Sequence, residues 1–348
     1  MAAVDKKYIR KWANHFKKLH AGKSYKASYL KYVSNLSRYG LPVIFEYKHL
    51  AALLGRTPEF VIFIVHSPQR FYSTFKIPKR SGGHREINVP YPSLLECHQW
   101  ILKNILNRFA LGTACHGFVR EKSIITNAKE HLGKKFLLKM DIKDFFHSIK
   151  LETVERIFYN AGYSSKVSKY LAAFCCLDNS LPQGAPTSPA LSNIAAYHMD
   201  KELCKAAEEA KLTYTRYADD LTFSGEMIYA NFKHHVAQIA KRHGFDINHE
   251  KTLLIKGNGQ KIVTGISVSG GQIRLPKKYK RNLRQEAYHY LTKGFPAHAK
   301  RKNIDELLYK EKLLGKLQFW KQVEPENSFL KWAIEAFEQI SANERTTE

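Results

Sequence analysis

The stretch that indicates the fold of this chain is TYTRYADDLTFSG, residues 213–225. They predict two short strands joined by a tight turn at Ala218-Asp219-Asp220. Glycine and asparagine are the residues that favour such a turn, and two adjacent carboxylates repel each other there. A bound cation would relieve that repulsion. On the pair alone, an ordinary solvated acidic turn remains the alternative.

A third acidic residue stands at the end of another predicted strand. Residues 136–142 form a mostly apolar run that predicts a buried strand, and Asp141 lies at its C-terminal end. Nucleotidyl transfer onto a growing strand uses two divalent ions roughly 4 Å apart. Magnesium prefers carboxylate oxygens and keeps its remaining positions for water and phosphates. Asp141 beside Asp219 and Asp220 therefore predicts a site for two Mg²⁺ ions.

The composition predicts a polyanionic partner. The formal net charge is +25, and 12% of the 348 residues are aromatic, which combines electrostatic attraction with surfaces on which bases stack. A basic protein without such a partner is the alternative. The five cysteines form no C-x-x-C pair, so we expect reduced thiols and no zinc site. The apolar runs are too short to span a bilayer, which predicts a cytoplasmic protein with no membrane partner.

Flanking segments predict the remaining elements. Residues 6–39 have an amphipathic helical pattern, and residues 74–91 predict a hairpin around Ser81-Gly82-Gly83. Helices are expected over 94–110 and 123–132. The proline-rich loop 181–189 should lead into a helix that is capped by Ser188 and reaches about residue 210. Further elements are expected as a helix over 230–243, an extended region over 252–268, a basic stretch over 274–302 and helices beginning near 304 and 328.

Three ordered motifs carry a resemblance to a known family. YADD (217–220), DIKDFF (141–146) and LPQGAP (181–186) together resemble the reverse transcriptases. Two further motifs, NAKEH (127–131) and VTG (263–265), make the chain similar to the bacterial retron reverse transcriptases. The resemblance covers roughly residues 75–291.

The resemblance assigns roles around the predicted metal site. It implies that Asp141 and Asp219 bind the catalytic metals, that the carbonyl of Ile142 completes one site and that Asp220 assists. Phe146 would clash with a ribonucleotide 2′-hydroxyl and so select deoxynucleotides. From spacing alone, however, Phe145 and Phe146 are better explained as core residues.

The same resemblance implies residues that hold the incoming deoxynucleoside triphosphate. Lys79 and Arg85, on the basic hairpin, would contact its phosphates, for which arginine and lysine are suited. Gln183 should lie against the sugar, and Lys251 matches a lysine that would protonate the leaving pyrophosphate. Solvated surface charges are the alternative for the three basic residues.

RNA contacts are implied by the retron motifs. Asn127 and His131 share one helical face and, with Val263, Thr264 and Gly265, are expected to contact the cognate noncoding RNA. A basic face beyond them should follow backbone phosphates. It comprises Arg274, Lys277, Lys278, Lys280, Arg281 and Arg284.

The predicted fold class is α+β with the right-hand polymerase architecture. We expect an N-terminal basic helical extension over 1–73 and fingers over 74–135. A palm with an antiparallel sheet, the catalytic motifs and some inserted fingers elements is expected over 136–270, and a helical thumb over 271–348. By resemblance, the enzyme would copy part of its own structured noncoding RNA into single-stranded DNA from an RNA 2′-hydroxyl. Such systems act in antiphage defence, often with a separate effector protein.

Three other functions remain open on the sequence. A group II intron-like or diversity-generating reverse transcriptase shares the catalytic motifs, although NAKEH and VTG favour the retron type. A noncatalytic RNA-binding scaffold would keep the fold, but the intact Asp141, Asp219 and Asp220 argue against it. A magnesium-dependent nuclease would use similar ligands.

Overall fold

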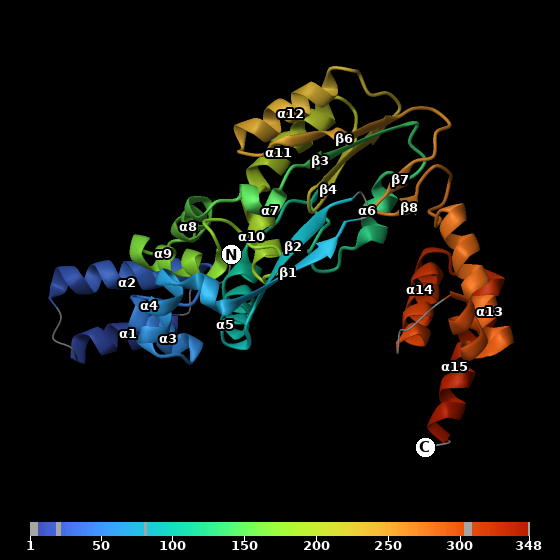
Figure 1. The fold of residues 1–348 in the computed structure, drawn as a ribbon. Coiled ribbons are helices and arrows are strands. Elements are labelled where there is room, and N and C mark those ends of the chain that lie inside the picture. Colours follow the sequence, from blue (N-terminus) through green and yellow to red (C-terminus); the bar gives the residue numbers. More distant parts are fainter. Residues whose placement is uncertain (1–5, 19–21, 80–81, 303–307, 347–348) are drawn as a thin grey trace.

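The computed structural model describes residues 6–18, 22–79, 82–302 and 308–346 (Figure 1). Helices of the N-terminal region lie at one end of the molecule, a four-stranded sheet lies in the middle, and three C-terminal helices lie at the other end (Figure 1). The expected mixture of helices with antiparallel sheet is confirmed. Within the described ranges, no helix has the length and apolar character needed to cross a membrane.

The N-terminal region is more than a basic extension on the surface. The predicted helical stretch divides into α1 (Lys6–Lys18) and α2 (Lys23–Arg38), and α3 (Tyr47–Leu54) and α4 (Pro58–His66) follow. Val43, Ile44 and Val61 are buried in the same hydrophobic core as the central sheet. Residues 41–64 therefore help to hold the region around the central sheet in shape.

The expected basic hairpin is present. After the short helix η1 (Pro68–Phe71), β1 (Tyr72–Pro78) pairs antiparallel with β2 (His84–Pro90). Arg80 and Ser81, at its tip, lie outside the described residues. The helix predicted over 94–110 is shorter: α5 (Pro92–Asn104) gives way to η2 (Leu106–Arg108). The helix α6 (Ile124–Glu130) begins at a capping box made by Ser123 and Thr126.

The central sheet has the strand order β4-β5-β3-β6, and all its strands pair antiparallel. The strands are β3 (Phe136–Ile142), β4 (Thr213–Tyr217), β5 (Asp220–Gly225) and β6 (Ile247–Ile255). The buried strand predicted over 136–142 and the hairpin over 213–225 are confirmed. Because β3 pairs antiparallel with β5, the C-terminal end of β3 lies beside the first residue of β5, where the β4–β5 turn ends.

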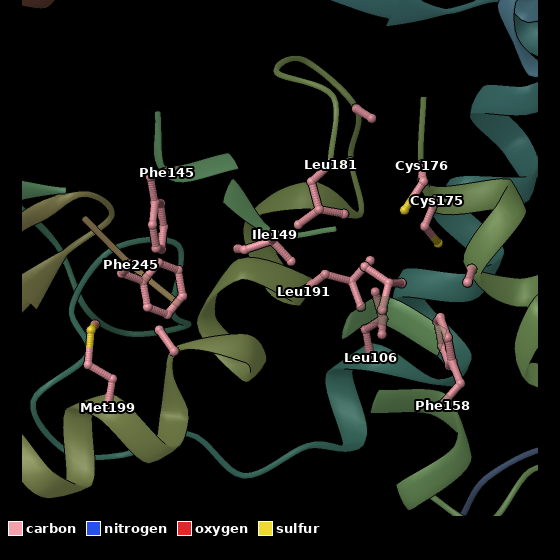
Figure 2. Close-up of a cluster of buried hydrophobic side chains, with 14 of the residues drawn as sticks. Leu106, Phe145, Ile149, Phe158, Cys175, Cys176, Leu181, Leu191, Met199 and Phe245 are labelled. Atoms are coloured by element: carbon pink, nitrogen blue, oxygen red, sulfur yellow. The ribbon is translucent and has the colours of Figure 1, made fainter. Parts of the chain in front are cut away.

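Helices surround the sheet and build its core. They are α7 (Phe145–Ser148), α8 (Leu151–Asn160), α9 (Ser165–Cys175), α10 (Ser188–Ala195), α11 (Tyr197–Glu209) and α12 (Phe232–Arg242). The single helix expected from Ser188 to residue 210 was wrong, because the chain breaks at Ala196, and Thr187 precedes the first helix. Figure 2 shows Leu191, Met199 and Phe245 among the apolar side chains that these helices bury.

The C-terminal region forms a second hydrophobic core. The short pair β7 (Ile262–Val263) and β8 (Ile266–Ser267) leads to α13 (Lys277–Lys302), which is kinked at Gly294, then α14 (Tyr309–Val323) and α15 (Ser328–Thr346). Leu317 and Trp320 are buried here together with Val263 and Ala128. This core therefore joins the C-terminal helices to α6 and to the VTG turn. All five cysteines are free, as expected.

Candidate active site

The three aspartates meet where two strands end. Asp141 is the direct cross-strand partner of Asp220. The backbone nitrogen of Ile142 donates a hydrogen bond of 2.9 Å to the carbonyl oxygen of Asp219. Pairing of β3 with β5 thus fixes Asp141 beside the Asp219-Asp220 turn, although about 80 residues separate them in sequence. The predicted convergence of these acidic positions is present.

One pocket collects the side chains. It has a volume of about 230 Å³ and is lined by Lys139, Met140, Asp141, Asp219, Asp220, Lys251 and Leu253. Burial, followed by the charge of Asp220, raises the pKa of Asp219. Burial also raises the pKa of Asp220, and the charge of Asp141 adds to the effect. The carboxylates therefore repel one another in a partly desolvated pocket, where a cation would be stabilised.

The donor set suits a hard divalent cation, because carboxylate oxygens from two strands face one pocket. Among the described residues, no three His, Cys, Asp or Glu side chains form a complete metal-binding group. In this arrangement the Lys251 ammonium is ion-paired with Asp141. That hydrogen bond, first among several interactions, raises the pKa of Lys251. A metal ion at Asp141 would compete with Lys251 for the same carboxylate.

A buried ion pair lies directly behind the Ala218-Asp219-Asp220 turn. The Arg216 guanidinium donates to both carboxylate oxygens of Asp200, at 2.7 Å from Nη2 and 2.8 Å from Nε, and these side chains are 0% and 4% exposed. Its Nη1 donates to the carbonyl oxygen of Ala218 at 3.1 Å. Burial alone would lower the pKa of Arg216, but the charge of Asp200 raises it by more, so the pKa lies above its ordinary value. This pair therefore ties α11 to the residue just before Asp219.

The turn itself is held in an unusual conformation. Ala218 has a φ of 56°, which is uncommon for a residue with a side chain. Gly117 packs against it so closely that a Cβ atom there would lie 2.5 Å from the Ala218 nitrogen. Asn193 joins the two sides, because its Nδ2 donates to Gly117 at 2.8 Å and its Oδ1 accepts from Arg216 at 3.0 Å. Gly117, Asn193 and the Arg216–Asp200 pair thus form a clamp behind the turn.

Sequence reasoning missed the four residues of this clamp, Gly117, Asn193, Asp200 and Arg216. One indication was available: Arg216 is a charged residue in a strand that is otherwise suited to burial. Such a residue requires a buried acidic partner. The partner itself could not be identified from sequence, since Asp200 lies on a different element.

The predicted triphosphate residues occupy different settings. Lys79 and Arg85 are exposed near the tip of the β1–β2 hairpin. Gln183 is half-buried, and its carbonyl oxygen accepts from the Asn88 nitrogen at 2.8 Å, which docks the LPQG loop against β2. A Cβ on Gly184 would lie 2.8 Å from the Asn88 oxygen, so glycine is required for this close approach.

The two phenylalanines of DIKDFF separate into different roles. Phe145 is 4% exposed and packs against Phe245 with ring centroids 5.7 Å apart, as Figure 2 shows. Phe146 is only half-buried and faces Phe118 at 6.5 Å. Phe145 is therefore a core residue, whereas Phe146 remains accessible for the predicted sugar-selecting role.

The retron motifs lie largely inside the protein. Asn127 is 1% exposed, His131 0% and Val263 0%, so these side chains are not placed to touch RNA as predicted. His131 instead bonds Ser224 on β5 at 2.7 Å and Thr215 on β4 at 2.8 Å. The motifs are thus packed into the fold.

The turn between β7 and β8, which forms part of the VTG motif, is accessible. The Thr264 hydroxyl donates to the Ile124 carbonyl at 2.9 Å, which connects the turn to α6. Gly265 is exposed and has a φ of 84°. Of the predicted RNA-contacting residues in the two motifs, Thr264 and Gly265 are therefore the ones at the surface.

The predicted basic face on the C-terminal region is mostly exposed. Arg274, Lys277, Lys278 and Arg281 are at the surface. Lys280 is ion-paired with Glu324 at 2.9 Å, so its charge is less available to a phosphate group. Arg284 lies 4.8 Å from the centre of the Phe329 ring, a cation–π contact that leaves it exposed.

Comparison with known proteins identifies relatives by sequence. The family model described as "Reverse transcriptase (RNA-dependent DNA polymerase)" matches residues 77–292. The retron Mx65 reverse transcriptase of Myxococcus xanthus is 33% identical over 306 residues, covering 81% of this chain and 71% of the relative. The retron Ec86 reverse transcriptase of Escherichia coli is 30% identical over 258 residues, covering 73% of this chain and 81% of the relative.

Solved structures give more distant matches. A telomerase from Candida albicans in complex with a fragment of telomeric RNA has a TM-score of 0.45 at 12% identity, covering 77% of this chain and 63% of that one. A foamy viral protease-reverse transcriptase in complex with double-stranded DNA has a TM-score of 0.45 at 16% identity, covering 78% of this chain and 39% of that one. The chain thus spans less than two thirds of both solved chains.

The sequence matches agree with the geometry. The family model covers the strands that carry Asp141, Asp219 and Asp220, and the antiparallel sheet with these residues at its strand ends is the palm expected of the right-hand polymerase architecture. The chain belongs to the reverse transcriptase (RNA-dependent DNA polymerase) family, and within it to the retron reverse transcriptases.

Proposed function

We propose that this RNA-directed DNA polymerase copies part of a cognate structured noncoding RNA into single-stranded DNA. Synthesis would start from an RNA 2′-hydroxyl, and the system would act in antiphage defence with a separate effector protein. The observation that carries the polymerase proposal is the meeting of Asp141, Asp219 and Asp220 at one pocket. The net charge of +25 supports a nucleic-acid partner.

Two Mg²⁺ ions, held by Asp141, Asp219, Asp220 and the Ile142 carbonyl, would activate the attacking hydroxyl and stabilise the leaving pyrophosphate. In each transfer, the hydroxyl would lose its proton to water and its oxygen would form a bond to the α-phosphorus of the nucleotide, while the bond from that phosphorus to pyrophosphate breaks. Lys251, which is ion-paired with Asp141, would give a proton to that pyrophosphate.

The chain's other predicted residues would select and hold the substrate. Lys79 and Arg85 would contact the triphosphate from the hairpin, and Gln183 would lie against the sugar. Phe146 would exclude a ribose 2′-hydroxyl. The basic face from Arg274 to Arg284 would follow the RNA backbone, with its affinity decreasing as salt increases.

The first experiment tests catalysis. Asp219→Asn should abolish extension of a labelled primer on an RNA template while binding to that RNA is kept, whereas the exposed Asp178→Asn control should extend normally. Extension, rather than shortening, of the primer excludes the nuclease alternative. Normal synthesis by Asp219→Asn would remove this residue from the metal site.

The second experiment tests priming. Nucleic acid that copurifies with the protein is sequenced, and the RNA is then incubated with the protein and deoxynucleotides. A DNA product that stays joined to RNA on a denaturing gel, loses that mass with ribonuclease and still forms when the RNA 3′ end is blocked supports 2′-hydroxyl priming. Product that forms only from an added primer would favour a group II intron-like or diversity-generating enzyme.

A further inference from the structure

A second pocket lies apart from the aspartates. Its volume is about 990 Å³, and it shares no lining residue with the catalytic pocket. It is formed by the end of α2, the segment around η2, α8, the α10–α11 junction and the end of α12. In Figure 1, α8 lies between α10 and the N-terminal helices, away from the C-terminal helices.

The lining of this pocket is positively charged. Among the described residues that form it, none is Asp or Glu, while Arg108 and Arg156 are exposed at its edge. Arg156 has a 3.4 Å hydrogen bond to the Thr153 hydroxyl, and neither arginine makes an ion pair with another described residue. Two guanidinium groups without a counter-ion therefore face a concave surface, where they can form forked contacts with phosphate.

A third arginine at this pocket is already neutralised. Arg242 and His243 both bind Glu202, and the hydrogen bond from His243, followed by that from Arg242, lowers the pKa of this carboxyl group. Arg242 and His243 therefore add no unpaired positive charge to the pocket. The unpaired charge of the pocket comes from Arg108 and Arg156.

Aromatic rings lie beside these charges. Tyr39 is 58% exposed and Tyr197 is 37% exposed, and both line the pocket. The Tyr197 ring is held edge-on by His198, with centroids 5.3 Å apart. Exposed rings next to unpaired arginines are the arrangement on which unpaired bases stack while their phosphates are bound.

We propose that this pocket binds a single-stranded segment of RNA at a second site, separate from the catalytic one. Arg108 and Arg156 would hold its phosphates, and Tyr197 and Tyr39 would stack on its bases. The identity of the ligand as RNA rests on the proposed function. An acidic protein segment would satisfy the charges but would leave the exposed rings without their stacking partners.

The test compares two double variants that remove equal charge. Arg108→Gln/Arg156→Gln removes the pocket arginines, and Lys166→Gln/Lys169→Gln removes two exposed lysines of α9 that do not line the pocket. Binding of a labelled single-stranded RNA 20-mer is titrated at several salt concentrations. Affinity decreases with salt, and for single strands the plot of log affinity against log salt should become less steep by about 1.4 in the arginine variant. The change should be smaller in the control.

A second measurement locates the RNA. The same RNA with 4-thiouridine is photocrosslinked to the full chain, and the attached peptide is identified by mass spectrometry. If a base stacks on Tyr197, we expect crosslinks to the peptide that contains this residue. In Tyr197→Ala these crosslinks should be lost, and the affinity for RNA should fall at least about fivefold. Equal effects of both double variants, or crosslinks elsewhere only, would overturn the proposal.

The two proposals fail separately. The inactive Asp219→Asn variant should still crosslink through Tyr197, because the pocket does not contain the aspartates. If Asp219→Asn proves active, the metal assignment is wrong while the pocket result stands. If an acidic peptide protects the pocket from chemical modification and RNA does not, the RNA assignment is wrong and a protein partner replaces it.

Discussion

Replacing Asp200 by asparagine tests the clamp behind the catalytic turn. The Arg216 side chain is 0% exposed and has Asp200 as its acidic partner. Asp200→Asn keeps the shape but leaves the guanidinium buried without a counter-ion, which costs roughly 3–5 kcal/mol. Since domains are stable by only about 5–15 kcal/mol, we expect a folded protein with a much lower urea midpoint.

The same change should slow the reaction. Arg216 also holds the Ala218 carbonyl, one residue before Asp219. A displacement of about 1 Å in a catalytic group can cost on the order of 100-fold in rate. We expect kcat for primer extension to fall by about that factor, while KM for the deoxynucleotide changes little, because Lys79 and Arg85 lie on a different element.

Urea unfolding and primer extension measure the two effects. The matched control is Glu209→Gln, which breaks the exposed pair of Glu209 with Lys205 and should leave the midpoint close to that of the parent. Both assays are run where the parent and variants are folded. An Asp200→Asn midpoint equal to that of the control would refute the reasoning from buried charge.

A double variant separates stability from positioning. Asp200→Leu/Arg216→Met removes both buried charges, so much of the stability should return. The rate should stay low, because the Ala218 carbonyl has lost its donor. Recovery of the rate together with the stability would show that Arg216 supports the fold only, without placing the catalytic turn.

Three further predictions test other parts of the site. Phe146→Val should admit ribonucleotides, measured as the ratio of kcat/KM for the two sugars; an unchanged ratio removes Phe146 from the nucleotide site. Gly117→Ala should displace Ala218 and so lower the rate on the order of 100-fold. The control Gly112→Ala, which has open space around it, should keep the parent rate. Equal rates for the two variants would contradict the close packing at Gly117. Burial lowers the pKa of His131 to about 3, so stability is full above pH 6.5 and decreases as the pH falls towards 3, by about 2 kcal/mol at pH 5. His131→Gln should reduce this loss between urea midpoints at pH 7.5 and 5.0, and an unchanged pH dependence would place the titration elsewhere.

The position of His131 illustrates what the sequence could not decide. Its spacing from Asn127 predicted a shared helical face, and that face is now seen to point into the protein. Which side of a helix is buried depends on what packs against it. For α6 the neighbours are β4 and the β7–β8 turn, which lie far away in sequence. The domain boundaries at 73, 135 and 270 likewise remain predictions.

The sequence by itself determined the local features of the site. The apolar run ending at Asp141 and the two strands around Asp219 and Asp220 were predictable, because strand formation and burial depend on short-range residue patterns. The break at Ala196, the Arg216–Asp200 pair and the basic pocket were decided only by the tertiary structure. Each depends on side chains brought together from separate elements, and local backbone preference carries no information about such partners.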